Sequence, residues 1–180
     1  FTSDHGDYAG EKGMFAKSET LYDCLLHVPM CFVPPAGYEF PRGERTDTLI
    51  DTVDIFPTIL GLAGAETPGH AQGYDLCEWL SGDRKDLRDY VFSQVGNYHG
   101  FLGTTFPSGM PAAGRHKGLL QRARSKHYSY VRDPDYGDEA YDLRNDSGEL
   151  HNILADGDGP AELNQVYEAL NAWESECRGL

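Results

Sequence analysis

Residues 1–17 read Phe1-Thr-Ser-Asp-His-Gly-Asp-Tyr-Ala-Gly-Glu-Lys-Gly-Met-Phe-Ala-Lys17 and bring three chemically distinctive side chains into one short segment. Asp4 offers a hard oxygen ligand and His5 an imidazole nitrogen, while Lys17 offers a mobile positive charge for a sulfate or phosphate oxygen. The glycines let the backbone turn and approach a ligand where a side chain would clash. This composition predicts one half of a metal site that binds an oxyanion.

Two interpretations of this segment stay open from the residues alone. A hard dication takes six or more oxygen-type ligands, so Asp4 and His5 by themselves leave a metal under-coordinated. The remaining ligands would lie further along the chain or in sequence that precedes it. The alternative is that Asp4, His5 and Gly6 form a simple turn, because Asp and Gly are common turn residues.

Three later stretches extend the pattern. The first segment is followed by His27-Val-Pro-Met30, then by Thr52-Val-Asp-Ile-Phe-Pro-Thr-Ile-Leu-Gly-Leu-Ala-Gly64, and finally by Tyr141-Asp-Leu-Arg-Asn-Asp-Ser-Gly-Glu149. In this order the motifs resemble the type I sulfatases of the alkaline-phosphatase superfamily, and three ordered matches are more specific than any one of them. The likeness runs from residue 1 to about residue 154, with a gap between about 95 and 120.

This resemblance implies roles for the first segment. Asp4 and His5 would be ligands of a divalent metal, Ca²⁺ in this family, and Lys17 would be the catalytic and substrate-binding residue that contacts a sulfate oxygen. His5 has a second interpretation, because a histidine at that position could instead hydrogen-bond the substrate. The implied substrate is a sulfate ester.

The resemblance also implies a formylglycine nucleophile, made from the Cys or Ser of a C-x-P-x-R motif. No cysteine of this chain begins that pattern, and no serine does. The chain therefore looks like the C-terminal portion of a sulfatase, with the formylglycine expected in an N-terminal half, and we expect the chain alone to be inactive. Two alternatives stay open: a hydrolase of the same superfamily that cleaves phosphodiesters or phosphonate monoesters, and a non-catalytic binding module. The cysteines, whose spacing predicts neither a zinc site nor a disulfide scaffold, are Cys24, Cys31, Cys77 and Cys177.

The charge balance excludes some partners. The chain has 29 Asp and Glu against 15 Lys and Arg, a formal net charge of −14. Broad nucleic-acid binding needs a basic face, so no nucleic-acid partner is expected. No apolar run approaches the roughly 20 residues that a membrane-spanning helix needs, so no membrane span is expected. The composition does not decide between a cytoplasmic and a periplasmic or secreted location.

The fold class predicted from the pattern is α/β, with a division near residue 85. The resemblance implies that residues 1–85 are the C-terminal segment of a large α/β catalytic domain, part of the sulfatase/alkaline-phosphatase-like fold, and supply a partial sheet layer. We expect a helix over residues 18–26, because Ser18 suits the N-cap position. A buried strand is expected over residues 30–33, and a second helix over residues 54–63 that ends at Gly64.

Residues 86–180 are predicted to form a small C-terminal subdomain, an antiparallel sheet with a C-terminal helix. Alternating stretches at residues 90–94, 127–131 and 140–143 indicate the strands, with Tyr128 and Tyr130 on one face. The helix begins near Pro160, which suits its first position. Residues 95–120 form a Gly/Pro-rich loop that is either a substrate-specificity loop or a mobile segment. The apolar stripe of the helix consists of Leu163, Val166, Tyr167, Leu170, Trp173 and Cys177.

An incomplete sheet layer has exposed edges. We therefore expect self-association, as a homodimer or larger, through such edges and through an uncovered apolar surface. The surface is expected at residues 28–33 and on the helix around Phe56, Ile59 and Leu60.

Overall fold

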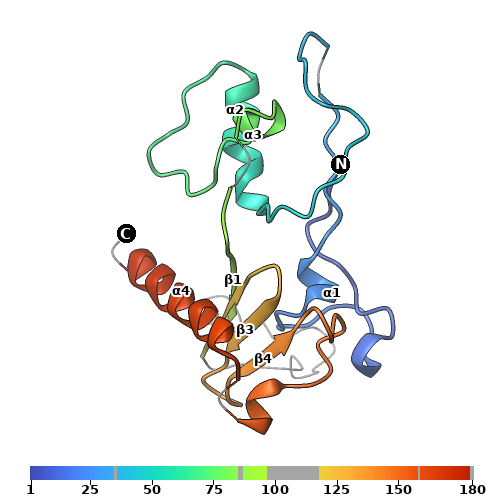
Figure 1. Ribbon diagram of the computed structural model, residues 1–180, viewed down its shortest axis with the longest axis vertical. Helices are drawn as coiled ribbons and strands as arrows, with labels where there is room; N and C mark the ends of the chain where they lie inside the picture. Colours follow the sequence, from blue (N-terminus) through green and yellow to red (C-terminus); the bar gives the residue numbers. More distant parts are fainter. Residues whose placement is uncertain (35, 85–86, 97–117, 158, 179–180) are drawn as a thin grey trace, which may run out of the picture. The chain divides into compact units, whose positions relative to one another are not determined.

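The computed structural model describes residues 1–34, 36–84, 87–96, 118–157 and 159–178 (Figure 1). Two compact units emerge, each considered by itself: Phe1–Met30 together with Phe92–Leu180, called the sheet unit below, and Cys31–Val91, called the helical unit. These units are defined by contacts in space. The predicted division into residues 1–85 and 86–180 is a division of the chain by sequence, and it stays a prediction. The loop expected over residues 95–120 lies mostly outside the described residues.

The sheet unit is built on four strands in the order β1-β2-β3-β4: Val91–Gly96, Leu119–Arg124, Tyr128–Arg132 and Glu139–Asp142. Strand β2 runs antiparallel to β3, with Ala123 opposite Tyr130, and β3 runs antiparallel to β4, with Tyr130 opposite Ala140. The predicted antiparallel sheet is confirmed. Strand β2 was not predicted, because it begins at the end of the Gly/Pro-rich stretch and carries three polar residues.

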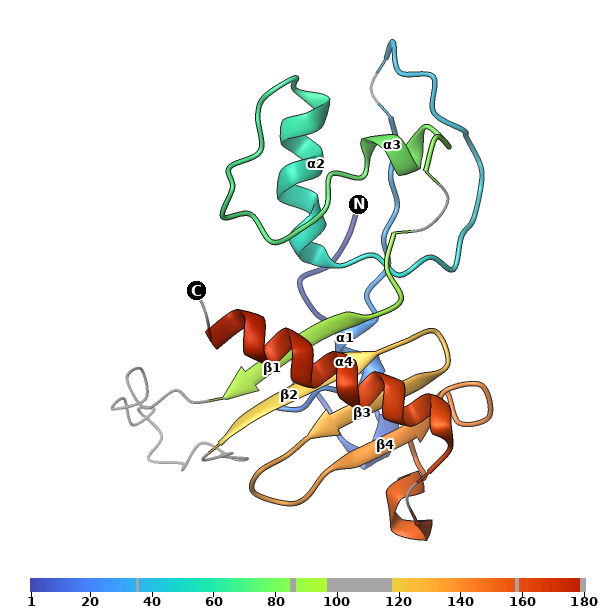
Figure 2. The ribbon, with the colours of Figure 1, turned by 60° about the vertical axis from the view of Figure 1, so that its left-hand side comes forward.

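Helix α4, Ala161–Arg178, lies across one face of this sheet (Figure 2). Successive residues of a strand point to opposite faces, and Tyr130 points to the helix, where its ring packs edge-on against Tyr167 at 5.2 Å. Phe92 of β1 stacks on Trp173 at 5.1 Å. The predicted stripe is confirmed at its centre, where exposure is 1% or less for Leu163, Val166 and Leu170.

The opposite face of the sheet is covered by the N-terminal segment. Leu21 packs with Leu120 of β2 and Val131 of β3 in a buried cluster. Helix α1 follows, but it spans only Asp23–Leu26, so the helix predicted over residues 18–26 is wrong in its first five residues. The reason is local: the Ser18 hydroxyl bonds to Tyr8 rather than capping a helix, and the backbone of Tyr22 is extended.

A buried ion cluster joins the N-terminal segment to the sheet. The Arg122 side chain is 2% exposed and donates to Asp23 Oδ1 at 2.7 Å and to Glu149 Oε1 at 2.9 Å. The backbone N–H of Asp23 donates to Glu149 Oε2 at 2.6 Å. Lys12, in the short 3₁₀ helix η1 (Glu11–Gly13), donates to the carbonyl of Glu149 and lies 4.0 Å from the ring centre of Tyr22. The segment of residues 1–17 is thus in direct contact with the motif of residues 141–149. A further 3₁₀ turn, η3 (Ile153–Asp156), follows that motif and precedes α4 in the chain.

The helical unit contains the 3₁₀ turn η2 (Thr52–Asp54), helix α2 (Ile55–Leu62) and the short α3 (Cys77–Leu80). Asp54 is fully buried: it accepts from Asp51 N–H in a capping box, from Tyr74 N–H at 2.8 Å and from Arg88 at 2.6 Å. Gly73 permits this close approach, since a Cβ there would lie 2.0 Å from the Val53 carbonyl oxygen. The helix predicted over residues 54–63 is confirmed.

The strand predicted over residues 30–33 is wrong. These residues form no ladder with another part of the described chain. A strand needs a neighbour to satisfy its backbone groups, and the four strands of the sheet unit pair among themselves. In the described residues no helix combines the length and apolarity that crossing a bilayer requires.

Apolar side chains stay exposed in the helical unit. Val33 is 75% exposed, and Phe56 and Ile59, one turn apart on α2, are 51% and 58% exposed. We propose that the chain self-associates through this surface, because burying it removes apolar area from water.

Ile59→Glu should therefore shift the chain toward monomer, as measured by light scattering at micromolar concentration. Gln72→Glu is the matched control, since Gln72 is exposed and the change adds the same charge without removing an apolar side chain. A wild-type chain that is monomeric under these conditions contradicts the proposal, and so does equal dissociation of both variants.

Candidate functional site

The three predicted site residues lie together on the surface of the sheet unit. Lys17 Nζ is 2.7 Å from His5 Nε2, and the same ring nitrogen is 3.7 Å from Asp4 Oδ2. The side chains of Asp4 and His5 are 86% and 39% exposed. Lys17, twelve positions along the chain, is brought back to the Asp4-His5 pair by the intervening loop.

The hydrogen bonds of His5 fix its tautomer. Nδ1 is 2.7 Å from the carbonyl oxygen of Gly6, which can only accept, so Nδ1 carries the proton. In the neutral ring Nε2 then holds a lone pair, and Lys17 donates to it. A cation and the Lys17 ammonium cannot use that one lone pair together.

Asp4 is held as a carboxylate. The backbone N–H of His5 donates to Asp4 Oδ1 at 3.0 Å, and this bond, followed by the nearby imidazole, lowers the pKa of Asp4. The carboxylate therefore stays charged over the neutral pH range and exposes an oxygen to solvent.

Glycine and a strained loop create this geometry. Gly6 N–H donates to the Leu25 carbonyl at 2.8 Å, and a Cβ on Gly6 would lie 2.0 Å from the Cys24 carbonyl oxygen. Only glycine lets the Asp4-His5 turn sit this close to α1. The loop that follows has positive φ at three non-glycine residues, Ala9, Lys12 and Ala16, a conformation that persists only where other contacts enforce it.

A metal ion would find two ligands here. Across residues 1–34, 36–84, 87–96, 118–157 and 159–178, no group of three or more His, Cys, Asp or Glu side chains is arranged to hold a metal. Asp4 and His5 suit a divalent ion in chemistry, but they supply too few of the six or more ligands that Ca²⁺ takes. The described residues thus do not form a complete Ca²⁺ site. No disulfide joins the four cysteines.

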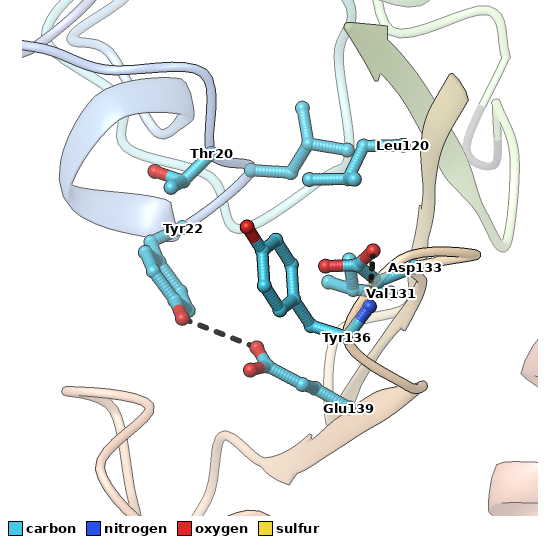
Figure 3. Close-up of a pocket in the computed structure, with 8 residues that line it drawn as sticks. Thr20, Tyr22, Leu120, Val131, Asp133, Tyr136 and Glu139 are labelled. Atoms are coloured by element: carbon cyan, nitrogen blue, oxygen red, sulfur yellow. Dashed lines mark hydrogen bonds between the residues drawn. The ribbon is translucent and has the colours of Figure 1, made fainter. Parts of the chain in front are cut away.

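A hollow of about 210 Å³ lies beside the segment that follows Lys17 (Figure 3). Tyr22 donates to Glu139 Oε2 across it at 3.1 Å, and burial together with that carboxylate raises the pKa of Tyr22 to about 12. Since its charged groups are the carboxylates of Asp133 and Glu139, an anion entering it would be repelled. The hollow does not suit a sulfate group. Its lining is Thr20, Leu21, Tyr22, Leu120, Val131, Asp133, Tyr136 and Glu139.

Tyr8 was not predicted as part of the site. Its side chain is 1% exposed, and its hydroxyl bonds to Ser18 at 2.8 Å and also to Thr20. A single tyrosine among glycines and charged residues gives no periodic signal, so its burial could not be predicted.

Comparison with known proteins identifies the family. The family model described as "N-sulphoglucosamine sulphohydrolase, C-terminal" matches residues 10–176. The chain belongs to this sulfatase family. Arylsulfatase K of Xenopus laevis is 26% identical over 172 residues, which cover 96% of this chain and 30% of that protein. The predicted identity as a type I sulfatase C-terminal portion is confirmed.

Solved structures agree on the fold. BT4656, solved in complex with its substrate D-glucosamine-2-N,6-O-disulfate, matches 99% of the sulfatase chain and 34% of its own with a TM-score of 0.79 at 21% identity. A phosphonate monoester hydrolase of Agrobacterium radiobacter matches 98% of the sulfatase chain and 34% of its own, with a TM-score of 0.76 at 25% identity. The predicted α/β fold is confirmed, and the chain spans about a third of the length of these relatives.

Proposed function

We propose that this chain forms the sulfate-contacting side of a sulfuric ester hydrolase. The observation that carries the proposal is the placement of the Lys17 ammonium against the His5 ring and the Asp4 carboxylate on an exposed surface. A lysine ammonium is a mobile point charge suited to one oxygen of a tetrahedral anion. Family membership supports sulfate as that anion.

In this proposal each residue has one task. Lys17 donates a hydrogen bond to a sulfate oxygen and stabilises the charge that develops on the transferring group. Gly6 holds the His5 ring so that Nε2 faces the same region. Once Lys17 turns to the sulfate, the Nε2 lone pair is open to a metal ion, or the imidazolium form donates to a substrate oxygen. Asp4 keeps a charged carboxylate oxygen beside His5 Nε2. Ca²⁺, held by Asp4, His5 and ligands from outside the described residues, would supply further positive charge when bound.

The nucleophile belongs to another segment in this proposal. A covalent mechanism needs an activated nucleophile, and no residue of the sequence stands in the C-x-P-x-R pattern from which formylglycine is made. The chain alone would then be inactive, and a complete protein would combine the nucleophile with Lys17. The likeness to a phosphonate monoester hydrolase favours one second candidate, cleavage of phosphonate monoesters or phosphodiesters at the same residues.

The test compares substrates and proteins. The complete protein that contains this chain should release para-nitrophenol from para-nitrophenyl sulfate faster than from para-nitrophenyl phenylphosphonate or bis(para-nitrophenyl) phosphate, and the chain alone should release none. A preference for the phosphorus esters selects the second candidate. Turnover by the purified chain alone contradicts the need for a separate nucleophile, and a complete protein that cleaves none of the three contradicts both candidate activities toward aryl esters.

A further inference from the structure

Both chain neighbours of Lys17 are bonded to one buried residue, Tyr8. The backbone N–H of Tyr8 donates to the Ala16 carbonyl at 2.9 Å. Its hydroxyl is 2.8 Å from Ser18 Oγ and also bonds to Thr20. Tyr8 therefore holds the chain immediately before and immediately after Lys17.

The loop from Tyr8 to Ala16 has backbone hydrogen bonds of its own, such as Gly10 N–H to the Met14 carbonyl at 2.9 Å, but three of its residues are in a strained conformation. Ala9, Lys12 and Ala16 have φ values of 47°, 52° and 61°, and such conformations need external contacts to persist. Phe15, which directly precedes Ala16, is 79% exposed. In the described part of the chain, the polar contact of the Lys17 side chain is His5 Nε2, so its position depends on how its backbone is held.

The remaining attachment of the loop is remote from Lys17. Lys12 bonds to the Glu149 carbonyl and fixes the middle of the loop to the buried ion cluster. A tyrosine hydroxyl donates one hydrogen bond and accepts others, so Tyr8 can satisfy Ser18 and Thr20 at once. Tyr8 lies three positions after His5 and thus links the two halves of the site.

We propose that Tyr8 is a positioning residue, whose buried hydroxyl sets the Lys17 ammonium against His5 Nε2; its importance for catalysis rests on the proposed function. The substitution Tyr8→Phe removes the hydroxyl and keeps the ring and the backbone bond to Ala16. It should free the segment around Ser18 and Thr20 and separate Lys17 from His5, while the sheet keeps its fold.

The experiment is nitrogen-15 NMR of the His5 ring in the 180-residue chain. Lys17→Met removes the contact directly and defines the Nε2 chemical shift of the separated state. Y8F should reproduce most of that change, with the amide resonances of β2, β3 and β4 unchanged. Tyr136→Phe is the matched control, since Tyr136 is 77% exposed, and it should leave the His5 signal at its wild-type position.

A second variant keeps the proposal testable if Y8F fails to fold. Ser18→Ala combined with Thr20→Val removes the same hydrogen bonds from their other end and should move the His5 signal in the same direction. A wild-type His5 signal in the folded Y8F chain, or in this double variant, overturns the role of Tyr8. The NMR measurement uses no sulfate ester. A failed sulfatase assay would therefore not contradict the positioning role of Tyr8, and an unchanged His5 signal would not contradict the sulfatase function.

Discussion

Replacing Arg122 by methionine should lower the free energy of unfolding by about 3–5 kcal/mol, the usual cost of breaking a buried ion pair from one side. Arg122 bridges Asp23, Glu149 and the Ser129 hydroxyl with distances of 2.7–2.9 Å. Methionine fills much of the same volume but leaves the Glu149 carboxylate, 2% exposed, without its cation. Urea unfolding should show a lower midpoint with an unchanged slope.

The pKa shifts of Asp23 and Glu149 show how the Arg122 guanidinium offsets the burial of these two carboxylates. Burial alone would raise the pKa of Asp23, but the guanidinium groups of Arg122 and Arg124 outweigh it and hold that pKa below its usual value. For Glu149 burial prevails and raises the pKa, although Arg122 and the Asp23 N–H oppose the rise. Loss of Arg122 would thus leave both carboxylates poorly compensated.

Two variants separate this cause from a general effect of losing an arginine. Arg144→Met breaks an ion pair with Asp142 on a side chain that is 42% exposed, so the midpoint should change little. Adding Glu149→Leu to R122M removes the stranded charge and should recover part of the loss, since the two residues interact directly. Equal destabilisation by R144M, or no recovery in the double variant, contradicts the proposed role of the buried pair.

The elements predicted correctly are those with a strong local signal. Helix α4 shows a full apolar stripe, helix α2 has Gly64 just beyond its end, and the sequences of strands β3 and β4 alternate clearly. Each of these patterns lies within a short window of sequence. Local pattern therefore identified the antiparallel sheet and its covering helix.

The predictions that failed depended on distant contacts. The buried role of Arg122 was not predicted, because its partners Asp23 and Glu149 lie 99 and 27 positions away. The start of α1 was misplaced because the hydroxyls of Ser18 and Thr20 bond to Tyr8. The strand expected over residues 30–33 has the composition of a strand but lacks a neighbour in the described chain. The sequence pattern of one segment does not show which distant residues will contact it in the folded chain.

The site was predicted as a set of residues rather than as a geometry. Asp4, His5 and Lys17 were chosen for their chemistry and the family motif, and the structure brings them within 3.7 Å of the His5 Nε2 atom. The tautomer of His5 depends on the Gly6 carbonyl, and the position of Lys17 depends on Tyr8. Neither contact can be predicted from the composition of the segment or from the spacing of its residues. The roles of the three residues stay predictions until they are tested in the complete protein.

In the complete protein, Lys17→Ala should reduce kcat/KM for a sulfate ester by about 10²–10³-fold, the scale of a lost charge-stabilising donor at a transferring group. The fold should survive, because Lys17 is exposed and lies outside the buried clusters of the sheet unit. Steady-state kinetics measures the first effect, and the urea midpoint measures the second. Lys126→Ala, also at an exposed lysine of the sheet unit, removes the same charge away from the site and should keep wild-type kinetics. If K17A and K126A have equal kcat/KM values, Lys17 does not contact the transferring group. If K17A lowers the urea midpoint as strongly as R122M does, its loss of activity reflects unfolding and not the removal of a charge beside the sulfate.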